Sequence, residues 1–344
     1  NDYSQPRLVG ALIPNVQVCR GIAAALACRA MLRVKEGKTE AAWQDLLACH
    51  RLGRLVGRGG SLIELLVGIA LDRIAGQADL ALLVHGNLTP KEIQKYMLDL
   101  QRLPPMPPIA DAVDLFERFM MLDALMLFAR EWPAFDESVG GANRRAKPGF
   151  WQKLFTRNVN WDPAFRNVNR WCDRYVAAAR ISDPTGRRAK MALISTEVNS
   201  IKKPSGITLA LQEKLMGPKT RGEMIGDLLV ALLLPAFDKL ETAAERNEQE
   251  CRNLRLAFAL AAYQRDHGRY PEALAELAPK YLDAVPDDIF SGKPLIYKPD
   301  AKGYLLYSVG ANGKDDGGQS FGDDPPGDDL VIRMPVPEPK SKNK

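Results

Sequence analysis

The residues that could do chemistry in this 344-residue chain are few and scattered. Its three histidines are His50, His85 and His267. None has an HExxH or comparable metal-ligand spacing, and none lies beside a serine or cysteine nucleophile in a recognisable frame. The acidic pair Asp287 and Asp288 is adjacent in sequence, which gives no glycosidase geometry of about 5 to 10 Å between carboxylates. The sequence therefore indicates no catalytic residue and favours a non-enzymatic function.

The cysteines give a second set of candidate residues. They are Cys19, Cys28, Cys49, Cys172 and Cys251. An odd number without CxxC spacing disfavours a zinc site and thioredoxin-like chemistry. If Gly37 is the turn of a helical hairpin, Cys28 and Cys49 lie about equally far on either side of it. A disulfide between them is one reading, and buried free thiols are the other.

Charge is distributed unevenly along the chain, whose formal net charge is +5. The segment 144–221 is strongly basic, and such charge attracts an acidic polymer, anionic lipid or an acidic partner. The residues predicted to grip such a ligand are Arg144, Arg145, Arg187 and Arg188. Because no RNP, zinc-finger or Gly-rich phosphate motif accompanies them, nucleic acid is not the favoured ligand.

Composition places the chain in the ordinary globular class, with 46% hydrophobic and 26% charged residues. The apolar runs over 65–71 and 228–236 are shorter than the roughly 20 residues that cross a membrane. The chain starts on the polar stretch 1–7, as it would if a signal or membrane anchor had been removed. The compartment of the protein therefore has to be inferred from other features of the chain.

Helical patterns dominate the first two thirds of the chain. Residues 16–58 predict two amphipathic helices that meet at Gly37. Residues 36–43, with small side chains opposite Trp43, resemble the turn and second helix of one tetratricopeptide repeat. A capping box at Thr89–Glu92 predicts the start of a further helix, which the proline run 104–108 ends.

A second helical region follows the proline run. Residues 111–130 predict a helix that is apolar nearly all round and therefore deeply buried. A long irregular loop is expected over 137–160, and Asp-Pro pairs at 162 and 183 predict the next two helices. One long helix is predicted from Met224 to about Asp266, with Pro235 as a kink.

In the last third of the chain, apolar and polar residues alternate as they do in β-strands. Leu295–Lys298 and Tyr304–Val309 predict a β-hairpin across the turn 299–303, packed on a helix. The fold class is therefore mainly α, with an α-hairpin N-terminal domain and a small α+β domain at the end. The predicted domains are 1–103, a helical hairpin domain; 104–221, a second helical region; 222–334, the long helix and α+β head; and 335–344, a disordered tail.

Four motifs of this last third resemble the soluble head of type II secretion major pseudopilins. Residues 263–271 resemble the family's helix end with its Gly-x-Tyr-Pro turn, and residues 286–297 resemble the loop that enters the first strand. Residues 304–314 resemble the second strand and its Ser-x-Gly-Ala-Asp-Gly turn. Asp328 and the residues after it stand where the family ends its loop before the last strand.

The resemblance implies a calcium site in the Gly/Asp-rich loop, because calcium takes six to eight oxygen ligands. The residues implied as its ligands are Ser308, Asn312, Asp323, Asp324, Asp328 and Asp329. Asn312 departs from the family's aspartate, and the loop is longer than the family's. Because about 220 residues precede this domain, the resemblance does not extend to a polymerising pilus subunit.

Three functional hypotheses follow. The first is a non-catalytic extracytoplasmic scaffold or protein-interaction protein of a bacterial envelope, with a calcium-binding pseudopilin-like head and a protein partner. The second is a basic-patch binding protein or hydrolase that acts on an acidic polymer. The third is a tetratricopeptide-like adaptor that binds a peptide in a helical groove.

Overall fold

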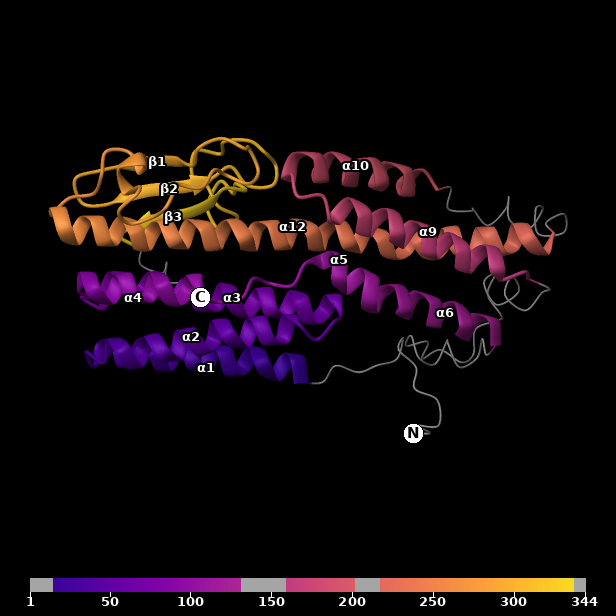
Figure 1. The fold of residues 1–344 in the computed structure, drawn as a ribbon, viewed down its shortest axis with the longest axis horizontal. Helices are drawn as coiled ribbons and strands as arrows, with labels where there is room; N and C mark the ends of the chain where they lie inside the picture. The colour runs from indigo at the N-terminus through magenta and orange to yellow at the C-terminus, as the bar shows by residue number, and fades with distance from the viewer. Residues whose placement is uncertain (1–14, 131–158, 202–216, 337–344) are drawn as a thin grey trace. The chain divides into compact units, whose positions relative to one another are not determined.

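The computed structural model describes residues 15–130, 159–201 and 217–336 (Figure 1). Arg144, Arg145, most of the loop predicted over 137–160 and most of the tail predicted over 335–344 lie outside these residues. The chain is mainly α-helical and carries one small antiparallel sheet near its C-terminus, which confirms the predicted fold class.

Two compact units divide the described residues. The first, here called the middle unit, holds Gly60–Leu62 and Pro108–Glu241. The second, here called the head-bearing unit, holds Asn15–Gly59, Ile63–Pro107 and the chain from Thr242 onward. The structure therefore groups the predicted N-terminal helical domain with the predicted head, and the boundary between the two units falls inside the long helix.

One continuous hydrophobic core is the physical reason for this grouping. It joins Trp43 and Leu46 of the N-terminal helices to Phe258 of the long helix and Leu306 of the sheet, all of which are fully buried. Neither the helices nor so thin a sheet could bury an apolar face alone, so each completes the other's core.

Four helices build the N-terminal part of the head-bearing unit: α1 (Asn15–Lys35), α2 (Thr39–Gly57), α3 (Leu62–His85) and α4 (Pro90–Gln101). Gly37, with a φ of +73°, makes the predicted turn between α1 and α2. The predicted capping box begins α4, where Thr89 and Glu92 satisfy each other's backbone N–H groups. A second helical pair, α3 and α4, thus follows the predicted hairpin.

Two glycines let α2 and α3 cross closely. A Cβ atom on Gly53 would lie 2.8 Å from the carbonyl oxygen of Gly68, and a Cβ on Gly68 would lie 2.5 Å from that of Gly53. Any larger residue would force the helices apart, because real Cβ atoms do not come so close to a carbonyl oxygen. This close crossing sets the distance between the polar side chains on the facing sides of α2 and α3.

The side chain of Trp43 on α2 holds α4 against α2 by two contacts. Its ring stacks on Tyr96 with the ring centroids 4.3 Å apart, and its indole Nε1 donates to Asp99 over 2.9 Å. A buried tryptophan needs such a partner for its N–H group. Trp43 therefore combines apolar packing with a satisfied polar end.

The head follows the long helix α12 (Pro218–His267), which runs through Pro235. It begins six residues before the predicted start at Met224 and ends one residue after Asp266. A short 3-10 turn, η2 (Leu274–Leu277), leads to strands β1 (Ile296–Pro299), β2 (Tyr304–Ser308) and β3 (Leu330–Met334). Their order is β1-β2-β3, antiparallel throughout. The predicted hairpin is confirmed, and the sheet lies along the C-terminal half of α12 (Figure 1).

In the middle unit, the described helices are α5 (Ile109–Ala112), the π-helical turn η1 (Val113–Glu117), α6 (Arg118–Arg130), α9 (Asp162–Ala179), α10 (Pro184–Ser200) and the first half of α12. The prediction of a deeply buried helix over 111–130 is wrong in part. Met121 and Leu125 are fully buried, but Leu115 is 70% exposed and Phe119 52% exposed. The segment packs on α9 along one side, so its opposite side stays outside the core.

All five cysteines are free thiols, so the structure contains no disulfide between Cys28 and Cys49. Cys49 is buried and Cys28 is exposed. None of the helices in the described ranges is both long enough and apolar enough to cross a membrane.

Candidate functional site

The loop between β2 and β3 carries most of the residues that the resemblance implies for calcium. Ser308 ends β2 and is buried, with its hydroxyl donating to Asp288 Oδ1 over 2.7 Å. Asn312 is exposed, and its side-chain amide donates to Asp316 over 3.0 Å. Asp324 is exposed at the outer part of the loop. Ser308 and Asn312 therefore contact acidic residues that the sequence analysis did not select.

The other three aspartates accept hydrogen bonds from within the protein. Asp329 accepts the backbone N–H groups of Gly318 (2.7 Å) and Asp316 (3.4 Å). Asp323 accepts both the N–H and the hydroxyl of Ser320, each over 2.7 Å. Asp328 accepts the N–H of Asn312 over 2.9 Å. Backbone donors thus hold these carboxylates inside the loop's own turns.

Two arginines add positive charge to the same loop. Arg246 of α12 forms an ion pair with Asp328, and Arg333 of β3 forms one with Asp323 over 3.0 Å. The backbone N–H and hydroxyl of Ser320 and the guanidinium of Arg333 lower the pKa of Asp323 to about 2. Burial raises the pKa of Asp329, against the two backbone N–H groups that it accepts.

These contacts decide how well the loop fits a calcium ion. In the described ranges, no three His, Cys, Asp or Glu side chains converge so as to hold a metal. The carboxylates of Asp323, Asp328 and Asp329 point at N–H donors and guanidinium groups instead. A calcium ion needs several of these oxygens turned to one point, and the described carboxylates are turned to protein donors, so calcium binding stays a prediction.

The predicted basic residues lie apart from this loop. Arg187 is on α10 in the middle unit, where it forms an ion pair with Glu241 over 2.9 Å and donates to the carbonyl of Ile181. Arg188 follows it and is half-buried. The Glu241 carboxylate thus offsets part of the positive charge of Arg187, and binding of an acidic polymer by Arg187 and Arg188 stays a prediction.

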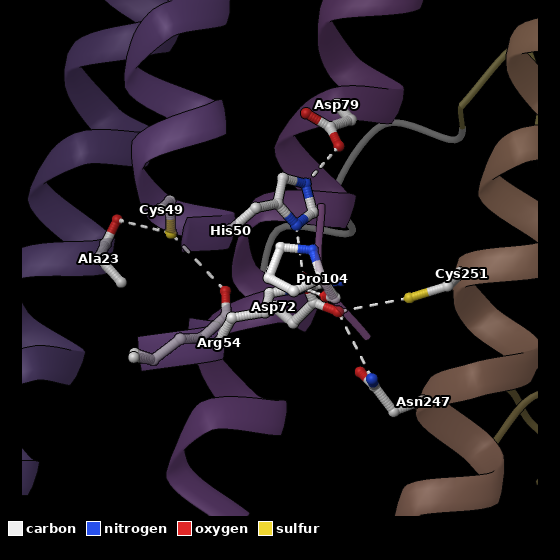
Figure 2. Close-up of polar contacts among 10 residues, drawn as sticks. Ala23, Cys49, His50, Arg54, Asp72, Asp79, Pro104, Asn247 and Cys251 are labelled. Atoms are coloured by element: carbon white, nitrogen blue, oxygen red, sulfur yellow. Dashed lines mark hydrogen bonds and ion pairs between the residues drawn. The ribbon is translucent and has the colours of Figure 1, made fainter. Parts of the chain in front are cut away.

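A buried polar cluster in the head-bearing unit is the other candidate site. Here it is called the His50 cluster and comprises His50 and Arg54 of α2 with Asp72 and Asp79 of α3 (Figure 2). His50 Nδ1 lies 2.5 Å from Asp72 Oδ1, and its Nε2 lies 2.8 Å from Asp79 Oδ2. Arg54 forms an ion pair with the same oxygen of Asp72. All four residues are buried.

Two contacts from α12 complete the cluster. Asn247 donates its side-chain amide to Asp72 Oδ2 over 3.4 Å, and the Cys251 thiol lies 3.3 Å from the same oxygen. Figure 2 shows both side chains reaching Asp72 from the α12 side. Asp72 thus connects three helices through one carboxylate.

Ionisation in the cluster follows from its geometry. An ionised carboxylate only accepts, so a ring placed between two carboxylates donates from both nitrogens and is an imidazolium. Burial opposes that charge, but Asp79 and Asp72 raise the pKa of His50 from 6.5 to about 9. Burial would also raise the pKa of Asp72, yet His50 and Arg54 hold it below its ordinary value. Burial raises the pKa of Asp79.

The cluster's chemical capacity is therefore limited. A general base needs a neutral nitrogen near neutral pH, and His50 has none to offer. Burial raises the pKa of Cys49 to about 12 and raises that of Cys251 further, so neither thiol is a ready thiolate nucleophile. The arrangement suits electrostatic bracing and ligand positioning.

Sequence reasoning singled out His50 but not its partners. Helical spacing carried a usable signal: His50 and Arg54 are four residues apart, and Asp72 and Asp79 are seven apart, so each pair occupies one helix face. The missing step was the pairing of the two faces, which the Gly53–Gly68 crossing decides.

A cavity of about 430 Å³ adjoins the His50 cluster within the head-bearing unit. It lies between α3, α12, β3 and the segment Ser320–Gly322 of the loop, and both His50 and Asp72 reach its wall.

A search of family models, of curated proteins and of solved structures finds no match to this chain.

Proposed function

We propose that the protein is a non-catalytic scaffold and protein-interaction protein of a bacterial envelope, and that it binds its partner on the outer face of α1. The observation that carries this proposal is that α1 is apolar on two opposite faces. Ala23, Ala30 and Val34 lie in the core. On the outer face, Val18 is 59%, Ile22 47% and Leu32 63% exposed.

The exposed side chains follow a regular stripe. Val18, Ile22, Ala25 and Leu32 are spaced by four, three and seven residues, which places them on one line along the helix. Arg29 lies on the same line, between Ala25 and Leu32, and is paired with Asp45 of α2. Such spacing forms the contact seam of two packed helices. A helix that is apolar all round is normally buried, so the stripe is suited to a partner that covers it.

Charge indicates the partner's chemistry. α1 carries Arg20, Arg29, Arg33 and Lys35 and no acidic residue. Asp45 of α2 pairs with both Arg29 and Arg33, so the positive charge offered to a partner comes mainly from Arg20 and Lys35. A second copy of α1 would bring like charges together, whereas an amphipathic helix with acidic flanks would complement them. We infer that the partner presents an acidic amphipathic helix.

The non-catalytic part of the proposal is supported by the closed pairing at the His50 cluster. The envelope location rests on the resemblance of the last third of the chain to pseudopilin heads. Calcium in the β2–β3 loop remains a prediction of that resemblance. Thermal unfolding of the full chain with calcium and with a chelator tests it, and an Asp328→Ala, Asp329→Ala variant is the control that should not respond.

Photo-crosslinking tests the docking face. A photoreactive residue at Leu32 of the full chain, produced in a bacterial host, should give one discrete adduct in the envelope fraction. The matched control is Leu98 of α4, which is 49% exposed and lies elsewhere on the unit. Ile22→Asp should remove the Leu32 adduct, because a carboxylate on the stripe repels an acidic partner. Equal labelling at Leu32 and Leu98 would refute the proposal.

A further inference from the structure

The cavity beside the His50 cluster has the properties of a ligand site. Its volume of about 430 Å³ lies in the range of small-molecule pockets, which run from about 300 to 1,000 Å³. Its walls come from helices and a strand of one compact unit. The space is therefore preformed by regular elements.

Gly76 indicates that the cavity is kept open. It lies inside α3, where a glycine destabilises a helix by roughly 0.5 to 1 kcal/mol relative to alanine. A Cβ atom at Gly76 would lie 3.7 Å from Leu254 Cδ2, an ordinary contact. Unlike Gly53 and Gly68, this glycine is not required by a close helix crossing. What its missing side chain provides is space at the cavity wall.

The apolar part of the cavity wall comes from two helices, a strand and the loop. Leu80 of α3, Leu254 of α12 and Ile332 of β3 contribute hydrocarbon to the lining. Phe321 stands in the loop at the edge of the cavity and is 86% exposed. An aromatic ring so exposed gains from stacking on an apolar ligand body, because that contact removes its surface from water.

The polar part carries both signs of charge. Three carboxylates line the cavity, those of Asp72, Glu250 and Asp329. Asp72 and Asp329 already accept from His50, Arg54 and the loop's backbone N–H groups, and Glu250 is paired with Arg73. Arg73 Nε forms an ion pair with Glu250 Oε2 over 2.9 Å. The guanidinium carries four more N–H groups on its two terminal nitrogens. Arg246, paired with Asp328, adds a second guanidinium to the wall.

We propose that this cavity binds a small amphipathic organic anion, a molecule with one carboxylate and an aromatic or branched aliphatic body. The carboxylate accepts from Arg73 and Arg246, as planar guanidinium groups bind planar carboxylates. The body occupies the space beside Gly76 and contacts Leu254 and Phe321. The His50 cluster, of which His50 and Asp72 form part of the wall, holds α2, α3 and α12 in place around the site.

Three probes of one shape and different charge test this class of ligand on the full chain at neutral pH. They are 3-phenylpropionate, its neutral amide and 3-phenylpropylamine, each titrated to its solubility limit by calorimetry and followed by NMR. We expect saturable binding of the acid, at least tenfold weaker binding of the amide and none of the amine. Equal binding of acid and amine, or binding of none of the three, would overturn the proposal.

Variants place the binding in this cavity. Gly76→Leu fills the space and should abolish acid binding, while Gly21→Leu, a substitution at an open position on α1, should leave it unchanged. Arg73→Gln should weaken the acid about tenfold and leave the amide unaffected, with the exposed Arg51→Gln as control. Unchanged acid binding in Gly76→Leu would locate the ligand elsewhere and refute the site.

A second variant covers the case in which Gly76→Leu does not fold. Phe321→Ala removes an exposed side chain from a loop, so the fold does not depend on it. It should weaken both the acid and the amide several-fold, because both carry the same ring. If Phe321→Ala and Arg73→Gln both bind the acid as the unaltered chain does, the cavity is not the site.

Discussion

The head-bearing unit gathers carboxylates in two regions and stabilises them by different means. In the His50 cluster, Asp72 and Asp79 are paired with charged side chains of another helix. In the head, Asp288, Asp316, Asp323, Asp328 and Asp329, here called the head carboxylates, accept mainly from backbone N–H groups and hydroxyls of the head itself. The first region depends on ion pairs between helices, and the second on hydrogen bonds within the loops and strands of the head.

This difference has an energetic consequence. Removing one partner of a buried ion pair leaves an uncompensated charge in a medium of low polarity. Removing an acceptor from a half-exposed turn leaves N–H groups that water can reach. The His50 cluster should therefore respond strongly to single substitutions, and the head carboxylates in proportion to their burial.

The largest effect is expected for Asp72→Ala. The substitution leaves Arg54 and His50 without their shared acceptor, and should lower the free energy of unfolding by about 3 to 5 kcal/mol. Chemical denaturation of the full chain measures it. Asp283→Ala, at an exposed position, is the control and should change stability by less than about 0.5 kcal/mol. Similar losses in both variants would contradict the comparison.

The second-largest effect is expected in the pH dependence of stability, to which His50 contributes. Because the folded pKa of His50 is raised from 6.5 to about 9, its contribution is fully present below pH 6.5 and is lost as the pH rises through 9. The shift corresponds to about 3 kcal/mol. His50→Gln should flatten this part of the profile, measured by denaturation between pH 6 and about 10. A profile that stays unchanged in His50→Gln would show that other groups cause it.

A buried head carboxylate, Asp288, should give a smaller loss of stability. Asp288 accepts from the hydroxyl of Ser308 and from the backbone N–H groups of Phe290 and Val309. Asp288→Ala leaves these donors unsatisfied and should destabilise the protein by about 2 kcal/mol. Asp287→Ala, at the exposed neighbouring position, should be nearly neutral. Denaturation midpoints of the two variants decide the point.

The smallest effect is expected for Asp323→Asn, which keeps one acceptor oxygen. It should cost less than about 1 kcal/mol at neutral pH, because the site is partly exposed and screened. The folded pKa of about 2 implies a contribution that is present above the unfolded value of about 3.9 and is lost as the pH falls through 2. Unfolding scans at pH 7 and 3 measure it, with exposed Asp324→Asn as control. A loss as large as that of Asp72→Ala would remove the distinction between the two regions.

The two regions also differ in how far the sequence could predict them. The acidic loop is visible as a run of Asp, Gly and Pro residues, and turn chemistry is local, so the loop and the strand before it follow from the pattern. The strand after it was implied only by the resemblance. The sequence could not show that Arg246 and Arg333 pair with its aspartates, since Arg246 comes from a helix 82 positions before Asp328. The calcium prediction did not include these competing cations.

Local signals determined the helix pattern of the N-terminal region. Gly37, the Thr89 capping box and the proline run after α4 predict where helices begin and end, because caps and turns depend on a few neighbouring residues. The alternating residues of β1 and β2 predict the hairpin for the same reason.

Only the tertiary structure decided which segments share a core. The Gly53–Gly68 crossing brings His50 between Asp72 and Asp79, and the packing of α12 on α3 forms the cavity beside Gly76. These are contacts between residues far apart in the chain, and helical periodicity gives the face of a residue without naming the face opposite it. That is why the sequence could present His50 alone, while its charge state and the adjoining cavity required the fold.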